Sequence, residues 1–216
     1  MINKGFTLSE VLITIAVIGV VAAMTLPVVI NKTQERQFIT AWKKSFAEIS
    51  NACLMLKNED VSFVGMGEND MLNNLAKYIK HTKICREGKL VEDGCAPEMY
   101  PIKTYSGQYL YGIKQGIDKI GGGTTCMLTN RGSIICMDTN IVHVDVNGYK
   151  LPNTIGKDIF SGTVQQDTLT FRPNIGQRSG YGPVDGVTNK TPATTGNGTC
   201  QTADYGYGCS AEKLLK

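Results

Sequence analysis

The hydrophobic positions divide the chain into a continuously apolar first segment and a remainder of mixed pattern. From residue 6 to residue 30, 18 of 25 residues are apolar, and Glu10 carries the only charge. A helix rises about 1.5 Å per residue, so the uncharged run 11–30 would extend about 30 Å, the thickness of a bilayer's hydrocarbon core. The sequence holds no second run of 18 apolar residues. We therefore expect a single helix of this kind.

After residue 31 the pattern becomes amphipathic. Apolar residues recur at spacings of three and four, which places them on one face of a helix: Phe38, Trp42, Phe46, Ile49, Cys53 and Leu56. The two patterns together predict one long helix from Phe6 to about Lys57, whose second half packs against the rest of the chain. Pro27 has no amide donor and is expected to bend this helix.

The remainder of the chain is rich in turns and predicts an antiparallel sheet. Glycine is concentrated there, with 22 of its 24 occurrences after residue 60. A short helix is expected first, with Asp70 as its N-cap and an inner side formed by Leu72, Leu75, Tyr78 and Ile79. Six strand signals follow, at 109–113, 126–128, 133–136, 141–146, 159–164 and 169–171. We predict an α+β fold in which the long helix covers an antiparallel meander, with an exposed loop at 173–198.

Seven cysteines favour an oxidising compartment. Cys126 and Cys136 would face each other across a hairpin, which permits a disulfide. Cys85–Cys95 and Cys200–Cys209 would close loops of similar size. Six cysteines allow 15 arrangements, and we expect nearest-neighbour pairing because it closes the shortest loops. Zinc ligation is the alternative, although no CxxC pair is present, and Cys53 is expected to stay free on the buried helix face.

One loop gathers oxygen-bearing side chains. Asp145, Asn147, Asn153 and Asp158 lie within 14 residues, but their spacing differs from that of an EF-hand. We expect an Asn-Gly turn braced by hydrogen bonds and no cofactor, with calcium bound by these four residues as the alternative.

Charge and motif content argue against several function classes. The net charge of +3 is too small to indicate a nucleic-acid partner by itself. The basic residues at 77–89 are interpreted as a solvated surface rather than a DNA-binding site. No GxSxG motif and no phosphate-binding loop are present, so we do not expect an enzyme. His143 and Asp145 are expected on the solvent-facing side of their strand.

The N-terminal residues give the most specific signal. A secretory signal peptide would have a shorter apolar run, and a plain membrane anchor leaves Glu10 unexplained, because a carboxylate in a membrane is costly without a cationic partner. The string Lys4-Gly5-Phe6-Thr7-Leu8-Ser9-Glu10, followed by Val11-Leu12-Ile13, resembles the processing signal of type IV pilins and type II secretion pseudopilins.

The resemblance implies residue roles and a division of the chain. A prepilin peptidase would cut between Gly5 and Phe6 and methylate the new amino terminus of Phe6, and Pro27 matches a helix-bending proline of the family. The Glu10 carboxylate would meet the Phe6 amine of a neighbouring subunit. Residues 1–5 would be the leader, 6–30 the transmembrane and polymerisation segment, and 31–216 the globular head.

The resemblance also implies function, partners and location. It indicates a structural subunit of a pilus or pseudopilus in the bacterial inner membrane, with a periplasmic head. Its partners would be other pilins, the peptidase and the assembly platform. The alternative is a minor pilin at the filament tip that binds a surface, DNA or a secreted substrate.

Overall fold

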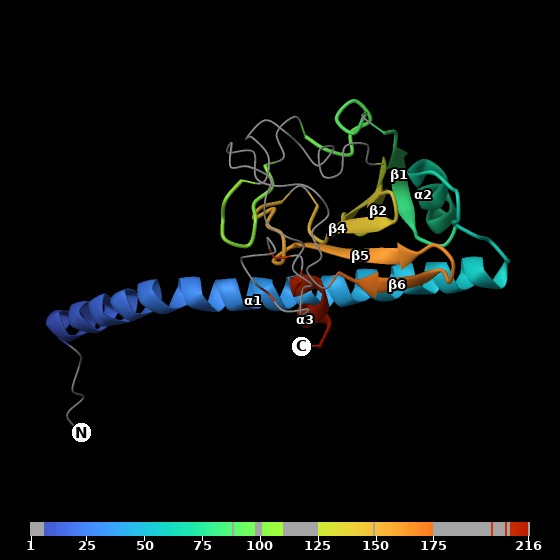
Figure 1. Ribbon diagram of the computed structural model, residues 1–216. Coiled ribbons are helices and arrows are strands. Elements are labelled where there is room, and N and C mark those ends of the chain that lie inside the picture. The colour runs from blue at the N-terminus through green and yellow to red at the C-terminus, as the bar shows by residue number, and fades with distance from the viewer. Residues whose placement is uncertain are drawn as a thin grey trace, which may run out of the picture. The chain divides into compact units, whose positions relative to one another are not determined.

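A computed structural model describes residues 7–87, 89–97, 101–109, 125–148, 150–174, 200, 206 and 208–215 (Figure 1). The chain separates into two compact units, Met1–Gln37 and Phe38–Lys216. Helix α1 (Leu8–Asn58) contributes to both units and continues through Pro27. The predicted long helix is therefore confirmed over the described residues, and Phe6 lies outside them.

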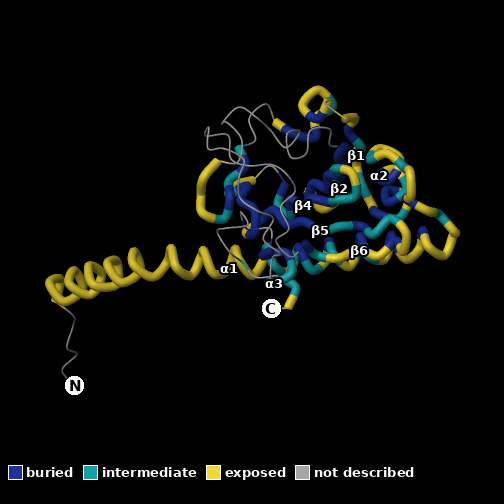
Figure 2. The backbone as a smooth tube through the Cα atoms, in the orientation of Figure 1, coloured by how far each residue is buried: buried dark blue, intermediate teal, exposed yellow. Residues whose placement is uncertain are grey.

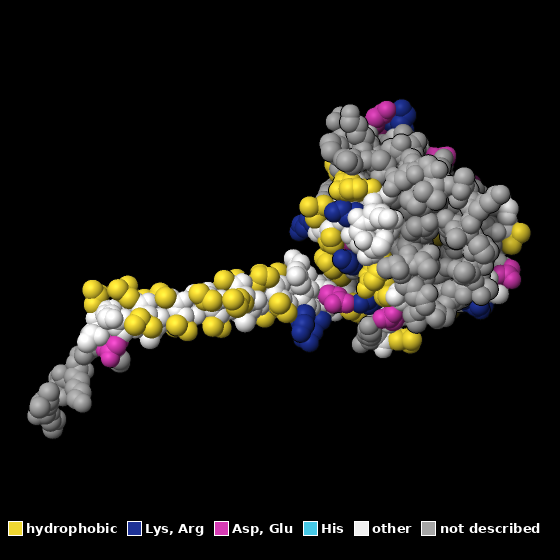
Figure 3. Space-filling model, turned by 60° about the vertical axis from the view of Figure 1, so that its left-hand side comes forward, with side chains coloured by type: hydrophobic (Ala, Val, Ile, Leu, Met, Phe, Trp, Pro, Cys, Tyr) yellow, Lys and Arg dark blue, Asp and Glu magenta, His cyan; other side chains and the backbone are white. Residues whose placement is uncertain are grey.

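The first unit consists of the N-terminal part of α1. Every described residue from Thr7 to Gln37 is exposed, as the uniform colour of this segment shows (Figure 2). Hydrophobic side chains recur along most of the visible face of this segment, and charged ones appear only toward its two ends (Figure 3). By length and composition, α1 is the one described helix that could cross a membrane. This is compatible with a single-pass membrane anchor.

The second unit contains a six-stranded antiparallel sheet and two short helices. The strands follow one another in chain order. Their bounds are β1 (His81–Cys85), β2 (Thr125–Thr129), β3 (Ile134–Asp138), β4 (Ile141–Asp145), β5 (Ile159–Gln165) and β6 (Thr170–Pro173). The helices are α2 (Glu68–Ala76) and α3 (Cys209–Leu215). The predicted α+β meander is confirmed.

The main core lies between one face of the sheet, α2 and the part of α1 from Phe38 onward. Trp42 is fully buried and stacks on Phe160 of β5, with ring centroids 5.2 Å apart. Ile49, Cys53 and Leu56 are buried beside it, as the helical spacing predicted. Burial raises the pKa of the Cys53 thiol to about 12, which keeps it protonated as a small apolar side chain.

A second core covers the opposite face of the sheet and contains two of the disulfides. Loop residues at 89–97, 101–109 and 150–158 contribute Leu90, Ile102 and Ile155 to it. All three predicted disulfides are present: Cys85–Cys95, Cys126–Cys136 and Cys200–Cys209. Both faces of the sheet are therefore buried.

This second layer corrects the prediction for His143 and Asp145. We expected both on a solvent-facing side, but they are only 2% and 1% exposed. His143 pairs across the sheet with Cys136 and Ser161, both of which are also buried. The strand alternation correctly separated two faces, but it could not show that loops cover the second one.

One strand was missed, and three further predictions differ from the structure or lie partly outside the described residues. Strand β1 was not predicted, because its sequence reads as part of a basic cluster. Helix α2 begins at Glu68 after an N-cap at Gly67 that makes no side-chain cap bond, so Asp70 lies in the first turn and is not the cap. Of the predicted strand 109–113, Tyr109 forms an isolated bridge with Lys103, and 110–113 lie outside the described residues, as do 175–198 of the predicted loop.

The burial of His143 predicts a specific pH dependence of stability. Desolvation lowers the pKa of His143 to about 4, so the native state keeps this side chain neutral while an unfolded chain protonates it near pH 6.5. The free energy of unfolding should fall by about 3 kcal/mol through this group as the pH decreases from about 6.5 to 4. Urea unfolding at several pH values should show this decrease in the native protein, and His143→Gln should lack it.

His81→Gln is the matched control, since His81 is partly exposed. If His143→Gln and the native protein had parallel pH profiles, the burial of a neutral His143 would be contradicted.

Candidate functional site

The first turn of α1 holds the Glu10 carboxylate by local hydrogen bonds. The Thr7 backbone N–H and the Thr7 hydroxyl both donate to Glu10 Oε2, each at 2.8 Å. The Glu10 backbone N–H in turn approaches Thr7 Oγ1 at 3.3 Å. This is a reciprocal capping arrangement, with Thr7 at the N-cap and Glu10 three residues later. It satisfies amide groups that the start of a helix leaves without partners.

The surroundings of Glu10 are apolar and almost free of charge. Leu8, Leu12 and Ile13 are 78%, 60% and 61% exposed, and the next charged residue along the chain is Lys32. Only one carboxylate oxygen is occupied within the described part of the chain, because both Thr7 donors reach Oε2. An exposed apolar surface with one carboxylate can therefore bury itself against another such helix and pair the carboxylate with a cation.

Of the four predicted processing and assembly residues, the structure describes two. Glu10 lies in the first turn of α1, and Pro27 lies within the helix. Gly5 and Phe6 lie outside the described residues. Thr7 was not singled out from the sequence as a partner of Glu10. The spacing Thr-x-x-Glu before an apolar run is the signal that could have identified it.

A second polar cluster occupies the loop between β4 and β5. Asp145 Oδ1 accepts hydrogen bonds from the backbone N–H groups of Asn147 and Gly148, at 3.0 and 2.9 Å. The Asp158 carboxylate accepts from the backbone N–H groups of Asn153 and Thr154, at 2.8 and 2.6 Å. The turn bracing that the sequence predicted is therefore present, and it uses both carboxylates.

The same cluster contains buried oxygens that these hydrogen bonds leave unsatisfied. Asp145 Oδ2, Asn147 Oδ1 and Asn153 Oδ1 are buried and have no hydrogen-bond partner among the described residues. Buried polar atoms without partners are uncommon and destabilising. Three oxygen atoms in one loop therefore need a donor or a cation.

The electrostatics of this loop also favour a positive charge. Burial raises the pKa of Asp145, and the nearby Asp158 carboxylate raises it further. Burial likewise raises the pKa of Asp158, although the backbone donors of Thr154 and Asn153 and the Asn147 side chain oppose this shift. The two carboxylates thus lie close enough to repel each other. Within the described residues no three His, Cys, Asp or Glu side chains form a metal-binding group, so amide oxygens would have to complete any site.

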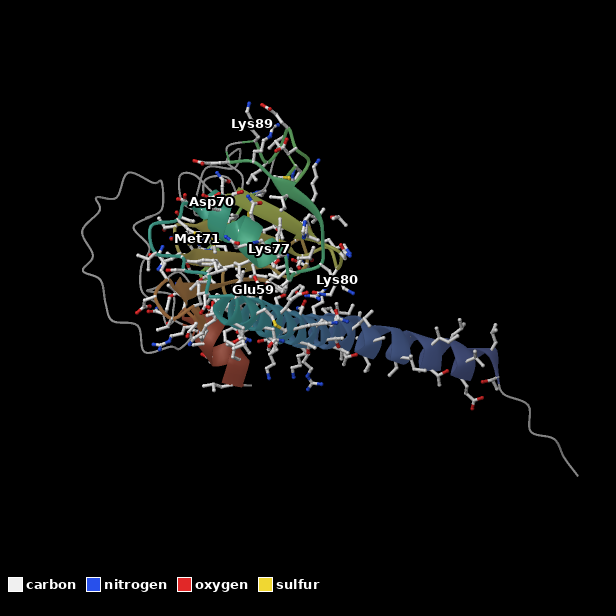
Figure 4. All side chains as sticks on the ribbon, turned by 90° about the vertical axis from the view of Figure 1, so that its right-hand side faces the viewer. Glu59, Asp70, Met71, Lys77, Lys80 and Lys89 are labelled. Carbon is white, nitrogen blue, oxygen red and sulfur yellow. A yellow bond between two sulfur atoms is a disulfide. The ribbon has the colours of Figure 1, made fainter. Side chains whose placement is uncertain are left out.

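The basic residues at 77–89 are dispersed and partly paired. Lys77, Lys80 and Lys89 come from the end of α2, the segment before β1 and the loop after it (Figure 4). Lys89 pairs with Glu92 at 2.7 Å, and Arg86 pairs with Asp93 at 2.7 Å. These acidic neighbours reduce the positive charge of the surface, so it carries no separate functional argument.

Comparison with known proteins agrees with the N-terminal geometry. A family model described as the prokaryotic N-terminal methylation motif matches residues 1–26. No curated protein and no solved structure matches the chain significantly. The matched residues include the predicted cleavage position, Phe6, Thr7 and Glu10, followed by most of the apolar run. The chain therefore carries the N-terminal signature of type IV pilins and pseudopilins, a motif that marks structural pilin-type subunits.

Proposed function

We propose that the chain is a structural subunit of a type IV pilus or of a type II secretion pseudopilus. A prepilin peptidase cleaves after Gly5 and methylates Phe6. Before assembly, the mature chain is anchored in the inner membrane by α1, with its second unit in the periplasm. An assembly platform then moves the apolar part of α1 from lipid into a bundle of such helices. The observation that carries this proposal is an apolar stretch of α1, residues 8–31, in which every residue is exposed and Glu10, within the methylation motif, carries the only charge.

Two physical terms drive the assembly. The apolar side chains of residues 8–30 exchange contact with lipid for contact with other helices, which gives packing energy but little direction. Glu10 makes the packing specific in its axial position, because a carboxylate in an apolar medium is strongly destabilised until it pairs with a cation. The amine of Phe6 in an adjacent subunit is such a cation. Their pairing fixes the axial position of one subunit against the next.

Removal of the Glu10 carboxylate should therefore block assembly without unfolding the second unit. We expect Glu10→Ala and the nearly isosteric Glu10→Gln to lower the filament yield at least about tenfold, equivalent to roughly 1.4 kcal/mol of lost pairing. Immunoblotting of filaments sheared from cells measures the yield, and mass spectrometry of the N-terminus verifies cleavage and methylation.

Glu87→Ala is the matched control, because Glu87 is an exposed carboxylate in the second unit. Normal filament yield from correctly processed Glu10→Ala would show that the pairing role is wrong. Immunogold labelling along the shaft would support a main subunit, whereas labelling at the end alone would support a minor subunit at the tip.

Thr7 should act on assembly through its hydroxyl. Thr7→Val keeps the shape of the side chain but removes one of the two donors to Glu10 Oε2, so we expect several-fold fewer filaments. Thr7→Ser retains the hydroxyl and should assemble like the native chain. The same shearing assay measures both variants. Equal yields from Thr7→Val and Thr7→Ser would contradict a role for the hydroxyl.

We also propose that the loop between β4 and β5 binds a calcium ion. The observation that favours calcium over a simple braced turn is the set of buried, unsatisfied oxygens: Asp145 Oδ2, Asn147 Oδ1 and Asn153 Oδ1. Calcium accepts carboxylate and amide oxygens together, and the Asp145 and Asp158 carboxylates would neutralise its charge. Such an ion would remove the repulsion between these carboxylates and stabilise the second unit.

The calcium proposal predicts opposite effects of one substitution in two buffers. In calcium at about a hundred times Kd, the native chain should gain about 2.7 kcal/mol of stability over the chelated form. Asp145→Asn should lose this gain, yet it should be more stable than the native chain in chelator because it removes one of two repelling charges. Thermal melting with calcium, magnesium or chelator measures both effects.

Asp167→Asn is the control, since Asp167 is an exposed carboxylate outside the loop. An unchanged melting temperature of the native chain in millimolar calcium would rule out the site and leave the hydrogen-bonded turn.

A further inference from the structure

The C-terminal helix α3 joins two elements of the second unit that lie far apart in the sequence. The backbone carbonyl oxygen of Ser210 accepts a hydrogen bond from Trp42 Nε1 of α1 at 2.9 Å. The hydroxyl oxygen of the same residue accepts one from the backbone N–H of Ser161 in β5, also at 2.9 Å. Ser210 is itself buried. One residue of α3 thus accepts a hydrogen bond from α1 and another from the sheet.

The position of Ser161 explains why the sheet needs α3. Strand β6 ends at Pro173, which pairs with Gly162 of β5. The next residue of β5 toward its start is Ser161, whose N–H donates to Ser210 instead of to a strand. A buried backbone N–H without an acceptor is destabilising. The Asn174 N–H still donates to the Ser161 carbonyl oxygen at 2.9 Å, so the Ser210 hydroxyl of α3 replaces only the strand acceptor for the Ser161 N–H.

Helix α3 cannot hold this position by its own stability. It is seven residues long, and isolated helices of this length are not stable in water. Two further features restrict the segment that contains it, because both join α3 to Cys200: the Cys200–Cys209 disulfide, and a hydrogen bond from the Cys200 backbone N–H to Glu212 Oε2 at 2.7 Å. Cys209 is fully buried, and its sulfur would lie 2.6 Å from a Cβ placed on Gly156. The disulfide therefore sits at the interface through which α3 contacts the rest of the unit.

We propose that oxidation of Cys200 and Cys209 controls the docking of α3, so that this helix is a redox-dependent latch on the second unit. The two thiols lose two protons and two electrons and form the S–S bond, and a disulfide-carrying oxidant such as a thiol oxidoreductase or oxidised glutathione is reduced to the dithiol level. The disulfide restricts the conformations of the segment from Cys200 to Cys209 before α3 docks. Docking of the oxidised segment therefore costs less conformational entropy than docking of the reduced one. In the reduced chain α3 separates, and Trp42 Nε1 and the Ser161 N–H lose their acceptors.

The chain contains its own reporter for this change, because Trp42 is its one tryptophan. In the full-length chain in detergent, Cys200→Ser/Cys209→Ser should shift the emission of Trp42 to longer wavelength. Hydrogen exchange of the Ser161 amide should become at least about tenfold faster, while the amides of β2, β3 and β4 stay protected. Cys85→Ser/Cys95→Ser is the matched control, since that disulfide lies in the second core, and it should leave Trp42 and Ser161 unchanged.

A second variant tests the contact without altering a cysteine. Ser210→Ala removes the hydroxyl acceptor of Ser161 but keeps the carbonyl that Trp42 uses. It should speed exchange at Ser161 with little change in Trp42 emission. In glutathione buffers, the emission of the native chain should follow the oxidation of Cys200 and Cys209 measured by thiol alkylation.

Three results would overturn the proposal. The first is unchanged Trp42 emission and Ser161 protection in Cys200→Ser/Cys209→Ser, and the second is an equal effect of the control disulfide. The third is loss of protection throughout β2, β3 and β4, which would show a global requirement instead of a latch. None of these readouts depends on filament assembly, so they are independent of the proposed function.

Discussion

The second unit depends on covering both faces of one six-stranded sheet. A sheet whose two faces are apolar needs a layer on each side, and this chain builds the layers by different means. On one face, α1 and α2 provide the apolar side chains of the main core, Trp42 among them. On the other face, loops without regular structure provide the cover, and the Cys85–Cys95 and Cys126–Cys136 disulfides lie within it. The disulfides compensate for the weak structural preference of those loops, because cross-links restrict the unfolded chain.

This two-sided burial explains where the sequence was informative. Helical spacing located the buried face of α1, because a long periodic pattern depends on a single neighbouring surface. Short apolar runs and turn residues located five of the six strands, because these signals lie within a few residues of each strand. The expectation that nearest-neighbour cysteines pair was also confirmed, and each partner lies within ten residues of the other.

The features that the sequence did not predict share one cause: each of them depends on contacts with residues distant in the sequence. His143 and Asp145 occupy positions that alternate with valines, and nothing local shows that loops from elsewhere cover them. Strand β1 contains two exposed polar residues, and it forms because β2 offers it an edge. The unsatisfied oxygens of the loop between β4 and β5 were equally invisible, since burial decides whether an oxygen lacks a partner. The Thr7–Glu10 arrangement is different, because the spacing Thr-x-x-Glu is local and could have predicted it.

The strand order has a consequence for how the second unit forms. Each strand pairs with the strands next to it in the sequence. Such local pairing has a low entropic penalty for loop closure and allows hairpins to form one after another during folding. Helix α3 cannot follow this order, because its partners on α1 and β5 are 168 and 49 residues away in the sequence. The contact of α3 with α1 therefore closes the longest loop among the contacts described above, and the second unit is complete only once α1, β5 and α3 have met.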